Sequence, residues 1–206
     1  MRVECYGATL AQDGNEDNED AFAIIRGETT CAAVCDGAGR AQQSAGKTLK
    51  LFEKLYRQTS GGQVGLFSTW ANYISLLDSS LLGIAQSTFV AVACYEGRMV
   101  GACVGDSRAY LRRRDGKVSI LMEHADKHRL GSGQANPAPI HLQAEKGDIL
   151  LLMSDGAWTP LSLYRLQKIL SKAASMHLAD LAPAILSEAG RGGRIDDMTV
   201  VVMKVM

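Results

Sequence analysis

Carboxylate side chains stand where predicted buried strands begin or end. Short acidic motifs occur at five places in the chain: Asn18-Glu19-Asp20, Asp36-Gly37, Gly105-Asp106-Ser107, Ser154-Asp155-Gly156 and Asp196-Asp197. Each motif alone is also typical of a turn, because Asp bonds its own backbone and Gly accepts a positive φ. Four of the five sites border strongly apolar strands, however, so a sandwich of sheets can gather them at one edge.

Carboxylates that converge in this way repel one another unless cations neutralise them. Ligand sets made only of oxygen suit hard ions such as Mg²⁺ or Mn²⁺. The acidic motifs therefore predict a divalent metal site at the edge of a sheet.

The elements that must position these carboxylates follow from the hydrophobic periodicity. Strands are predicted over residues 2–9, 21–25, 29–35, 88–95, 99–104, 108–113, 117–121, 148–153 and 198–205. Helices are predicted over residues 42–58, 67–86, 161–174 and 177–189, and residues 122–139 are expected to be irregular. Hairpins combined with helix pairs, without a regular βαβ alternation, favour antiparallel sheets covered by helices. The expected class is α+β, with two stacked sheets and a helix layer on each outer side.

Composition indicates one globular domain over residues 1–206. The chain is 47% hydrophobic and 21% charged, and its 22 Lys and Arg balance its 22 Asp and Glu. This balance gives no global reason to expect a nucleic acid or an acidic membrane as partner. Five cysteines in apolar surroundings are expected to be buried free thiols, which favour a reducing compartment. With no signal-peptide pattern and no apolar run of about 20 residues, we expect a cytoplasmic protein.

The order and the strand context of the acidic motifs resemble the metal-dependent protein phosphatase family, also called protein phosphatase 2C, in its bacterial serine/threonine branch. The resemblance runs from about residue 5 to residue 205, and its most specific element is Gly105-Asp106-Ser107-Arg108-Ala109-Tyr110. It implies an αββα four-layer sandwich with a centre of two Mn²⁺ or Mg²⁺ ions. The implied reaction is direct hydrolysis of phosphoserine or phosphothreonine in proteins, with water activated by the metals.

The resemblance also implies roles for individual residues. Asp36 matches the carboxylate that bridges both metals, and Asp106 matches an acid of a weak third metal in some members. The other implied ligands are Glu19, the carbonyl of Gly37, Asp155 and Asp196. Asp36, Asp155 and Asp196 are thereby expected to be the catalytic acids. The implied supporting acids are Asp20 and Asp197.

The chain departs from the family where the substrate phosphate is held. Family members commonly carry an arginine four or five residues before the Glu-Asp pair, whereas residues 14–16 here are Gly, Asn and Glu. The candidates for a replacement are Arg40, Arg191 and Arg194, because a guanidinium forms a two-pronged contact with phosphate. For each of these arginines, the favoured interpretation is nevertheless a solvated surface residue.

Two further departures concern the rim of the site. Only 19 residues separate Leu121 from His141, so the flap that family members place there is reduced. Thr159 stands where many members have an Asp for the third metal, which would weaken a site built on Asp106 alone.

Three functions remain open from the sequence. The first is an active phosphatase whose substrate is a protein phosphorylated by a bacterial serine/threonine kinase. The second is a catalytically weak or inactive phosphatase fold used as a binding or regulatory module. The third is the branch that dephosphorylates antagonists of anti-sigma factors. Metal-dependent turnover of a small phosphomonoester separates the first and third functions from the second.

Overall fold

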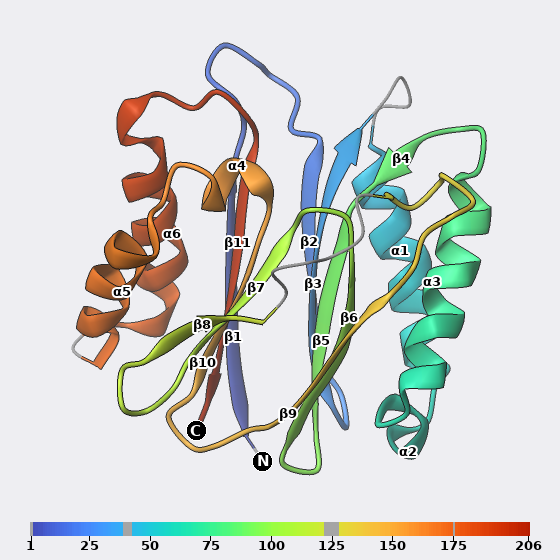
Figure 1. Cartoon of the computed structure of the whole chain (residues 1–206), viewed down its shortest axis with the longest axis horizontal. Helices are drawn as coiled ribbons and strands as arrows, with labels where there is room; N and C mark the ends of the chain where they lie inside the picture. The colour runs from blue at the N-terminus through green and yellow to red at the C-terminus, as the bar shows by residue number, and fades with distance from the viewer. Residues whose placement is uncertain (1, 39–42, 122–127, 175) are drawn as a thin grey trace.

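Two antiparallel sheets pack face to face, and helices cover the outer side of each sheet (Figure 1). This computed structural model describes residues 2–38, 43–121, 128–174 and 176–206. The arrangement confirms the predicted αββα sandwich of the α+β class. None of the described helices is long and apolar enough to cross a membrane.

The first sheet has five strands and is covered by α5 and α6. Its strands, in spatial order, are β1 (Val3–Leu10), β11 (Met198–Val205), β10 (Ile149–Met153), β7 (Arg108–Arg112) and β8 (Val118–Ile120). The covering helices are α5 (Leu163–Ser171) and α6 (Leu178–Ala189). The side chain of Ser162 accepts a hydrogen bond from the Arg165 amide, which caps the start of α5.

The second sheet is covered by α1 (Ser44–Arg57) and α3 (Phe67–Leu81), with the short α2 (Gly61–Val64) between them. Its strands, in spatial order, are β2 (Asp20–Ile25), β3 (Thr30–Ala38), β5 (Phe89–Tyr95), β6 (Arg98–Val104) and β9 (Ala138–Gln143). A further two-residue strand, β4 (Gln86–Ser87), pairs with the end of β3.

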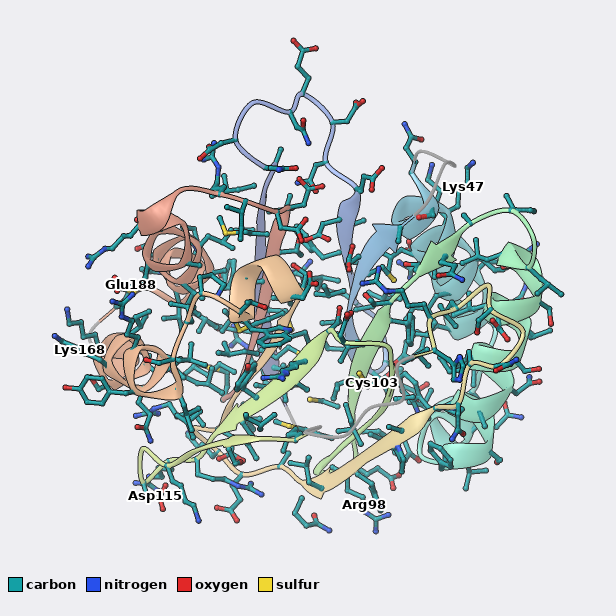
Figure 2. All side chains as sticks on the ribbon, turned by 45° about the horizontal axis from the view of Figure 1, so that its top comes forward. Lys47, Arg98, Cys103, Asp115, Lys168 and Glu188 are labelled. Atoms are coloured by element: carbon teal, nitrogen blue, oxygen red, sulfur yellow. The ribbon has the colours of Figure 1, made fainter. Side chains whose placement is uncertain are left out.

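The core alternates along each buried strand, because successive side chains point to opposite faces of a sheet. On β3, Cys31, Ala33 and Cys35 face the α1–α3 helices, while Ala32 and Val34 face the other sheet. All five cysteines are free and buried, as predicted. Cys103, labelled in Figure 2, lies in the layer between the two sheets.

Several elements differ from the sequence prediction, among them α2 and β4, which were not predicted. The helix predicted over 67–86 ends at Leu81, because residues 86–87 pair with β3 instead. Strand β9 begins inside the stretch expected to be irregular, although residues 122–127 of that stretch lie outside the described residues. The prolines that suggested irregularity include Pro139, which β9 tolerates because this strand lies at the edge of its sheet. The four-residue helix α4 (Asp155–Trp158) was not predicted.

The registers bring the acidic motifs to one edge of the sandwich. Asp20 at the start of β2 lies opposite Asp36 near the end of β3. In the other sheet, Met153 at the end of β10 lies opposite Val200 of β11 and Arg108 of β7. The motifs that flank these strand ends therefore meet at the upper edge in Figure 1.

Phe52 is the centre of an aromatic cluster that fixes α1 and α3 on the second sheet. Its ring lies 5.0 Å from that of Phe89 and 5.6 Å from that of Tyr73, both edge to face. We expect Phe52→Ala to lower the free energy of unfolding by about 3–5 kcal/mol, because it leaves a cavity. Urea denaturation measures this change.

Phe67→Ala is the matched control, because Phe67 is 41% exposed at the start of α3. Its expected cost is below about 1 kcal/mol. Equal losses for the two variants would contradict the assignment of Phe52 to the core.

Candidate active site

Three carboxylates meet at this edge from three different parts of the fold. Asp36 lies near the end of β3, Asp106 in the turn between β6 and β7, and Asp155 at the start of α4. One oxygen of each lies within 4.8 Å of the others. We call these three residues the acidic triad. They provide the oxygen-only donor set that suits a hard divalent cation.

The end of β3 is held by its neighbours so that Asp36 is presented to the site. The Asp36 amide donates to Thr88 Oγ1 at 2.9 Å, and Ser87 Oγ donates to the Asp36 carbonyl at 3.1 Å. The Gly37 amide donates to the Glu19 carbonyl at 3.2 Å. These contacts place Gly37 and Glu19, both predicted to be metal ligands, directly beside Asp36.

Asp155 and Asp196 are neighbours because α4 packs tightly against the start of β11. A Cβ on Gly156 would lie 2.1 Å from the Asp197 carbonyl oxygen, so only glycine fits at this close approach. Burial raises the pKa of Asp155, and the nearby carboxylates of Asp106 and then Asp196 raise it further. Asp196 itself is exposed and accepts a hydrogen bond from the Asp197 amide at 2.9 Å.

Asp197 connects β11 to the acidic loop between β1 and β2. Its two carboxylate oxygens accept from the Gln12 amide at 2.8 Å and from the Glu19 amide at 2.5 Å. The Glu19 side chain is exposed, and this contact fixes its backbone. The described carboxylates that converge within 4.8 Å of one another do not include Glu19 or Asp196.

Asp20 joins the two sheets behind the triad. It is buried, and its carboxylate accepts from Ser154 Oγ at 2.6 Å. Ser154 Oγ in turn accepts from the Thr199 amide at 2.9 Å. One polar chain thereby links the start of β2 to the residue before α4 and to β11.

The electrostatics of the site favour a bound cation. Burial and, to a smaller extent, the nearby charges of Asp20, Asp155 and Asp106 together raise the pKa of Asp36 to about 8, although Arg129 opposes the shift. Burial also raises the pKa of Asp20 to about 7. Ionised carboxylates are costly here, and divalent cations would remove that cost. The residues present therefore fit a metal centre.

Arg129 is the functional candidate that the sequence did not reveal. Its Nη2 atom lies 3.2 Å from Asp36 Oδ2 and 3.2 Å from Asp106 Oδ2. It stands in the stretch expected to be irregular, where no periodicity indicates the direction of a side chain. The sequence feature that could have pointed to Arg129 is its position in the shortened segment between Leu121 and His141, where family members place the flap.

Asp106 is held by a contact that crosses from α4. The indole Nε1 of Trp158 donates to the Asp106 carbonyl at 3.0 Å, and the Arg108 guanidinium lies 3.3 Å from the centre of the Trp158 ring. Trp158 thus fixes the turn that carries Asp106.

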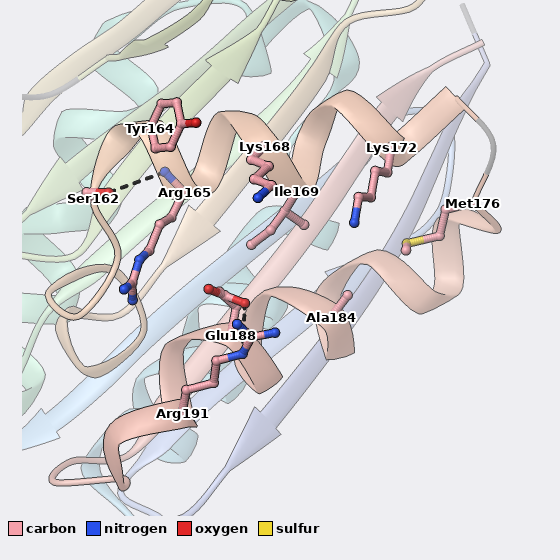
Figure 3. A pocket seen from close by; sticks show the side chains of 10 residues that line it. All are labelled: Ser162, Tyr164, Arg165, Lys168, Ile169, Lys172, Met176, Ala184, Glu188 and Arg191. Carbon is pink, nitrogen blue, oxygen red and sulfur yellow. Dashed lines mark hydrogen bonds and ion pairs between the residues drawn. The ribbon is translucent and has the colours of Figure 1, made fainter.

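The arginines predicted to bind phosphate have other contacts in the part of the chain that the structure describes. Arg194 pairs with Asp13 of the acidic loop. Arg191 pairs with Glu188 at 3.0 Å, and both line a groove of about 500 Å³ between α5 and α6 (Figure 3). Arg40 lies outside the described residues. Phosphate binding by these three residues stays a prediction.

Comparison with known proteins decides the family. A family model described as Stage II sporulation protein E (SpoIIE) matches residues 26–206. The chain belongs to the SpoIIE family. This match and the structural neighbours confirm the resemblance to metal-dependent protein phosphatases. Among curated protein sequences, none matches the chain significantly.

Solved structures show which proteins share the fold of this SpoIIE member. A serine/threonine phosphatase of S. agalactiae superposes with a TM-score of 0.86 at 19% identity, covering 100% of both chains. The catalytic domain of the phosphatase PstP, solved in complex with two manganese ions, gives 0.81 at 22% identity over 99% of both chains. A serine/threonine phosphatase of Staphylococcus aureus gives 0.86 at 18% identity, over 100% of this chain and 96% of the other.

Removing the Asp197 carboxylate should loosen the acidic loop. We expect Asp197→Ala to lower the free energy of unfolding by about 1–3 kcal/mol, because the amides of Gln12 and Glu19 lose their acceptors. Glu16→Ala, on the exposed part of the same loop, should change it by less than about 0.5 kcal/mol. Urea denaturation compares the two. A neutral Asp197→Ala would show that the loop is not held by this carboxylate.

The buried Asp20 should make the metal-free protein less stable as the pH rises. Its pKa is raised to about 7 from an ordinary value near 3.8, so the folded state binds a proton that the unfolded state has already lost. Stability due to this proton is complete below about pH 4 and is lost as the pH rises through about 7. Asp36, whose pKa is raised to about 8, likewise contributes stability that is lost as the pH rises through about 8.

Denaturation in EDTA across this pH range measures the effect. We expect Asp20→Asn to reduce the fall in unfolding free energy between about pH 4 and 7, and Asp115→Asn, in the exposed β7–β8 turn, to leave it unchanged. An unaltered slope for Asp20→Asn would show that Asp20 ionises normally.

Proposed function

We propose that this chain is a metal-dependent phosphatase that hydrolyses phosphoserine and phosphothreonine in proteins. The observation that supports it most is the acidic triad, whose ligand oxygens lie within 4.8 Å of one another. This triad stands at the sheet edge of a fold shared with bacterial serine/threonine phosphatases. Membership of the SpoIIE family agrees with the proposal.

The proposed cofactors are two Mn²⁺ or Mg²⁺ ions, with Asp36 shared between them. The further proposed ligands are Glu19, the carbonyl of Gly37, Asp155 and Asp196. Two such ions, when bound, lower the pKa of a water molecule and stabilise the oxygens of a phosphoryl group. In support, PstP has been solved with two manganese ions.

The contribution of the chain itself is to hold these oxygens in place before the substrate arrives. Asp197 fixes the backbone of Glu19, and Ser154 fixes Asp20 behind the triad. Ala38, which follows the Asp36-Gly37 turn, has no side-chain proton to donate. We expect the leaving alkoxide to take its proton from water or from an acid on the substrate side.

Asp106 is proposed as the acid of a weaker third site. Its side chain is 49% exposed and contacts Arg129, which already neutralises part of its charge. Thr159 at the end of α4 offers a hydroxyl in place of a carboxylate. Both features weaken cation binding at this position relative to the site on Asp36.

The proposed substrate is a phosphorylated protein, modified by a bacterial serine/threonine kinase, in the cytoplasm. Residues 1–206 are proposed to act as one domain, with no nucleic acid or membrane as partner. The balanced charge of the chain supports this choice. A small phosphorylated antagonist protein and a kinase activation loop are the two substrates to compare.

A catalytically inactive binding module is less well supported. Its basis is the absence of an arginine at residues 14–16 and the short flap. The converging carboxylates oppose it, because a fold that bound no cation would gain nothing from their mutual repulsion.

Hydrolysis of p-nitrophenyl phosphate with Mn²⁺, with Mg²⁺ and with EDTA tests the proposal. We expect EDTA to abolish turnover, and Asp36→Asn to lower kcat/KM by at least about a hundredfold, because a shared metal ligand is removed. Asp115→Asn in the β7–β8 turn is the matched carboxylate control and should leave kcat/KM unchanged. Activity that survives EDTA would contradict a metal-dependent reaction, and absence of activity with every metal would favour the binding module.

A further inference from the structure

Arg129 is a cation placed inside the acidic site by the chain itself. One guanidinium nitrogen lies 3.2 Å from a carboxylate oxygen of Asp36 and 3.2 Å from one of Asp106. The side chain is 21% exposed, so the pairs are partly shielded from water. The positive charge of Arg129 therefore stands among the oxygens that the proposed function assigns to divalent ions.

The backbone beside Arg129 is fixed to β4, which pairs with the end of the strand that carries Asp36. Leu130 and Ser87 exchange two backbone hydrogen bonds of 2.9 and 3.1 Å. Ser87 Oγ donates to the Asp36 carbonyl at 3.1 Å, so the same residue holds both Leu130 and Asp36. Movement of the Arg129 backbone relative to Asp36 would break these bonds.

A second anchor follows directly after Leu130 along the chain. The buried Asp78 of α3 accepts from the Gly131 amide at 2.6 Å and from the Gly133 amide at 3.2 Å. Gly131 has φ +88°, and a Cβ there would lie 2.0 Å from the Ala85 carbonyl oxygen, so the chain passes too close for any other residue. Because the backbone is held, the guanidinium can change its partner only when the Arg129 side chain adopts another rotamer.

We propose that Arg129 has two partners in turn: Asp36 and Asp106 without metal, and the phosphate of the substrate once divalent ions neutralise these acids. The inference rests on the proposed function. A divalent ion and the Arg129 guanidinium compete for Asp36, because each cation is stabilised by the negative charge of the same carboxylate. The guanidinium then leaves the two acids, while its backbone stays fixed. The substrate phosphate is the anion that it can bind instead.

The chemistry of the side chain fits this second partner. A guanidinium presents a planar fork of N–H donors that matches two oxygens of a phosphate, which a lysine ammonium does not reproduce. Residues 14–16, where related phosphatases are expected to carry a phosphate-binding arginine, offer none here. Arg129 thus supplies that function from the other side of the site.

The first measurement is Mn²⁺ binding to the metal-free full chain by calorimetry, for wild type, Arg129→Gln and Arg129→Lys. Arg129→Gln removes the competing charge, so the dissociation constant for Mn²⁺ should fall by about threefold to tenfold. Arg129→Lys keeps the charge and should stay close to wild type. Arg57→Gln, which alters an arginine paired with Glu53 on the outer helix α1, is the matched control.

The second measurement is binding of inorganic phosphate to the Mn²⁺-loaded proteins, together with kcat and KM for p-nitrophenyl phosphate. Both Arg129→Gln and Arg129→Lys should weaken phosphate binding and raise KM by about tenfold or more, because both lose the fork. Arg57→Gln should change neither quantity.

The outcomes separate this inference from the function on which it rests. Wild-type turnover with unchanged phosphate affinity in Arg129→Gln would overturn the inference and leave the phosphatase intact. An Arg129 that only stabilises the fold would give weaker Mn²⁺ binding and a lower Tm in Arg129→Gln. If Arg129→Gln fails to fold, Arg129→Lys decides through its phosphate affinity. A wild type without metal-dependent turnover would overturn the proposed function itself.

Discussion

The mutual repulsion of carboxylates at a half-buried edge is the constraint on which this structure depends. Asp36 and Asp155 come from different sheets, and burial makes the ionised form of each unfavourable. Holding them together requires a framework that does not relax when they repel. The chain provides it with Asp20 and Ser154, which join the two sheets, and with Asp197, which holds the loop before β2.

The rest of the fold makes this framework rigid. Three apolar layers, one between the sheets and one beneath each helix pair, fix the strands whose ends carry the acids. At the edge itself, close approaches replace side-chain packing, as where Gly156 meets the backbone of Asp197. Substitutions far from the chemistry can therefore displace the triad, because the positions of its oxygens are set by how the layers pack.

Much of the fold and of the acidic edge was predictable from the sequence. Buried strands are continuous apolar runs, and the acids lie directly beside those runs, so the motifs at Asp36, Asp106 and Asp155 could be found without coordinates. Strand β9 was missed because Pro139 within it and Pro137 just before it suggest a loop, and only its place at a sheet edge makes Pro139 acceptable. Arg129 was missed because its contacts join distant parts of the chain through a loop with no periodic pattern.

The division of the triad between the two sheets has a mechanical consequence. Asp36 belongs to one sheet, Asp155 follows a strand of the other, and Asp106 lies in the turn that crosses between them. Whatever is held by all three acts as a cross-link over the open end of the sandwich. Sliding of one sheet over the other changes the width of this gap, so occupancy of the site and shear of the sandwich are coupled. A filled site therefore resists the opening of the sheets, and binding there stabilises the whole fold.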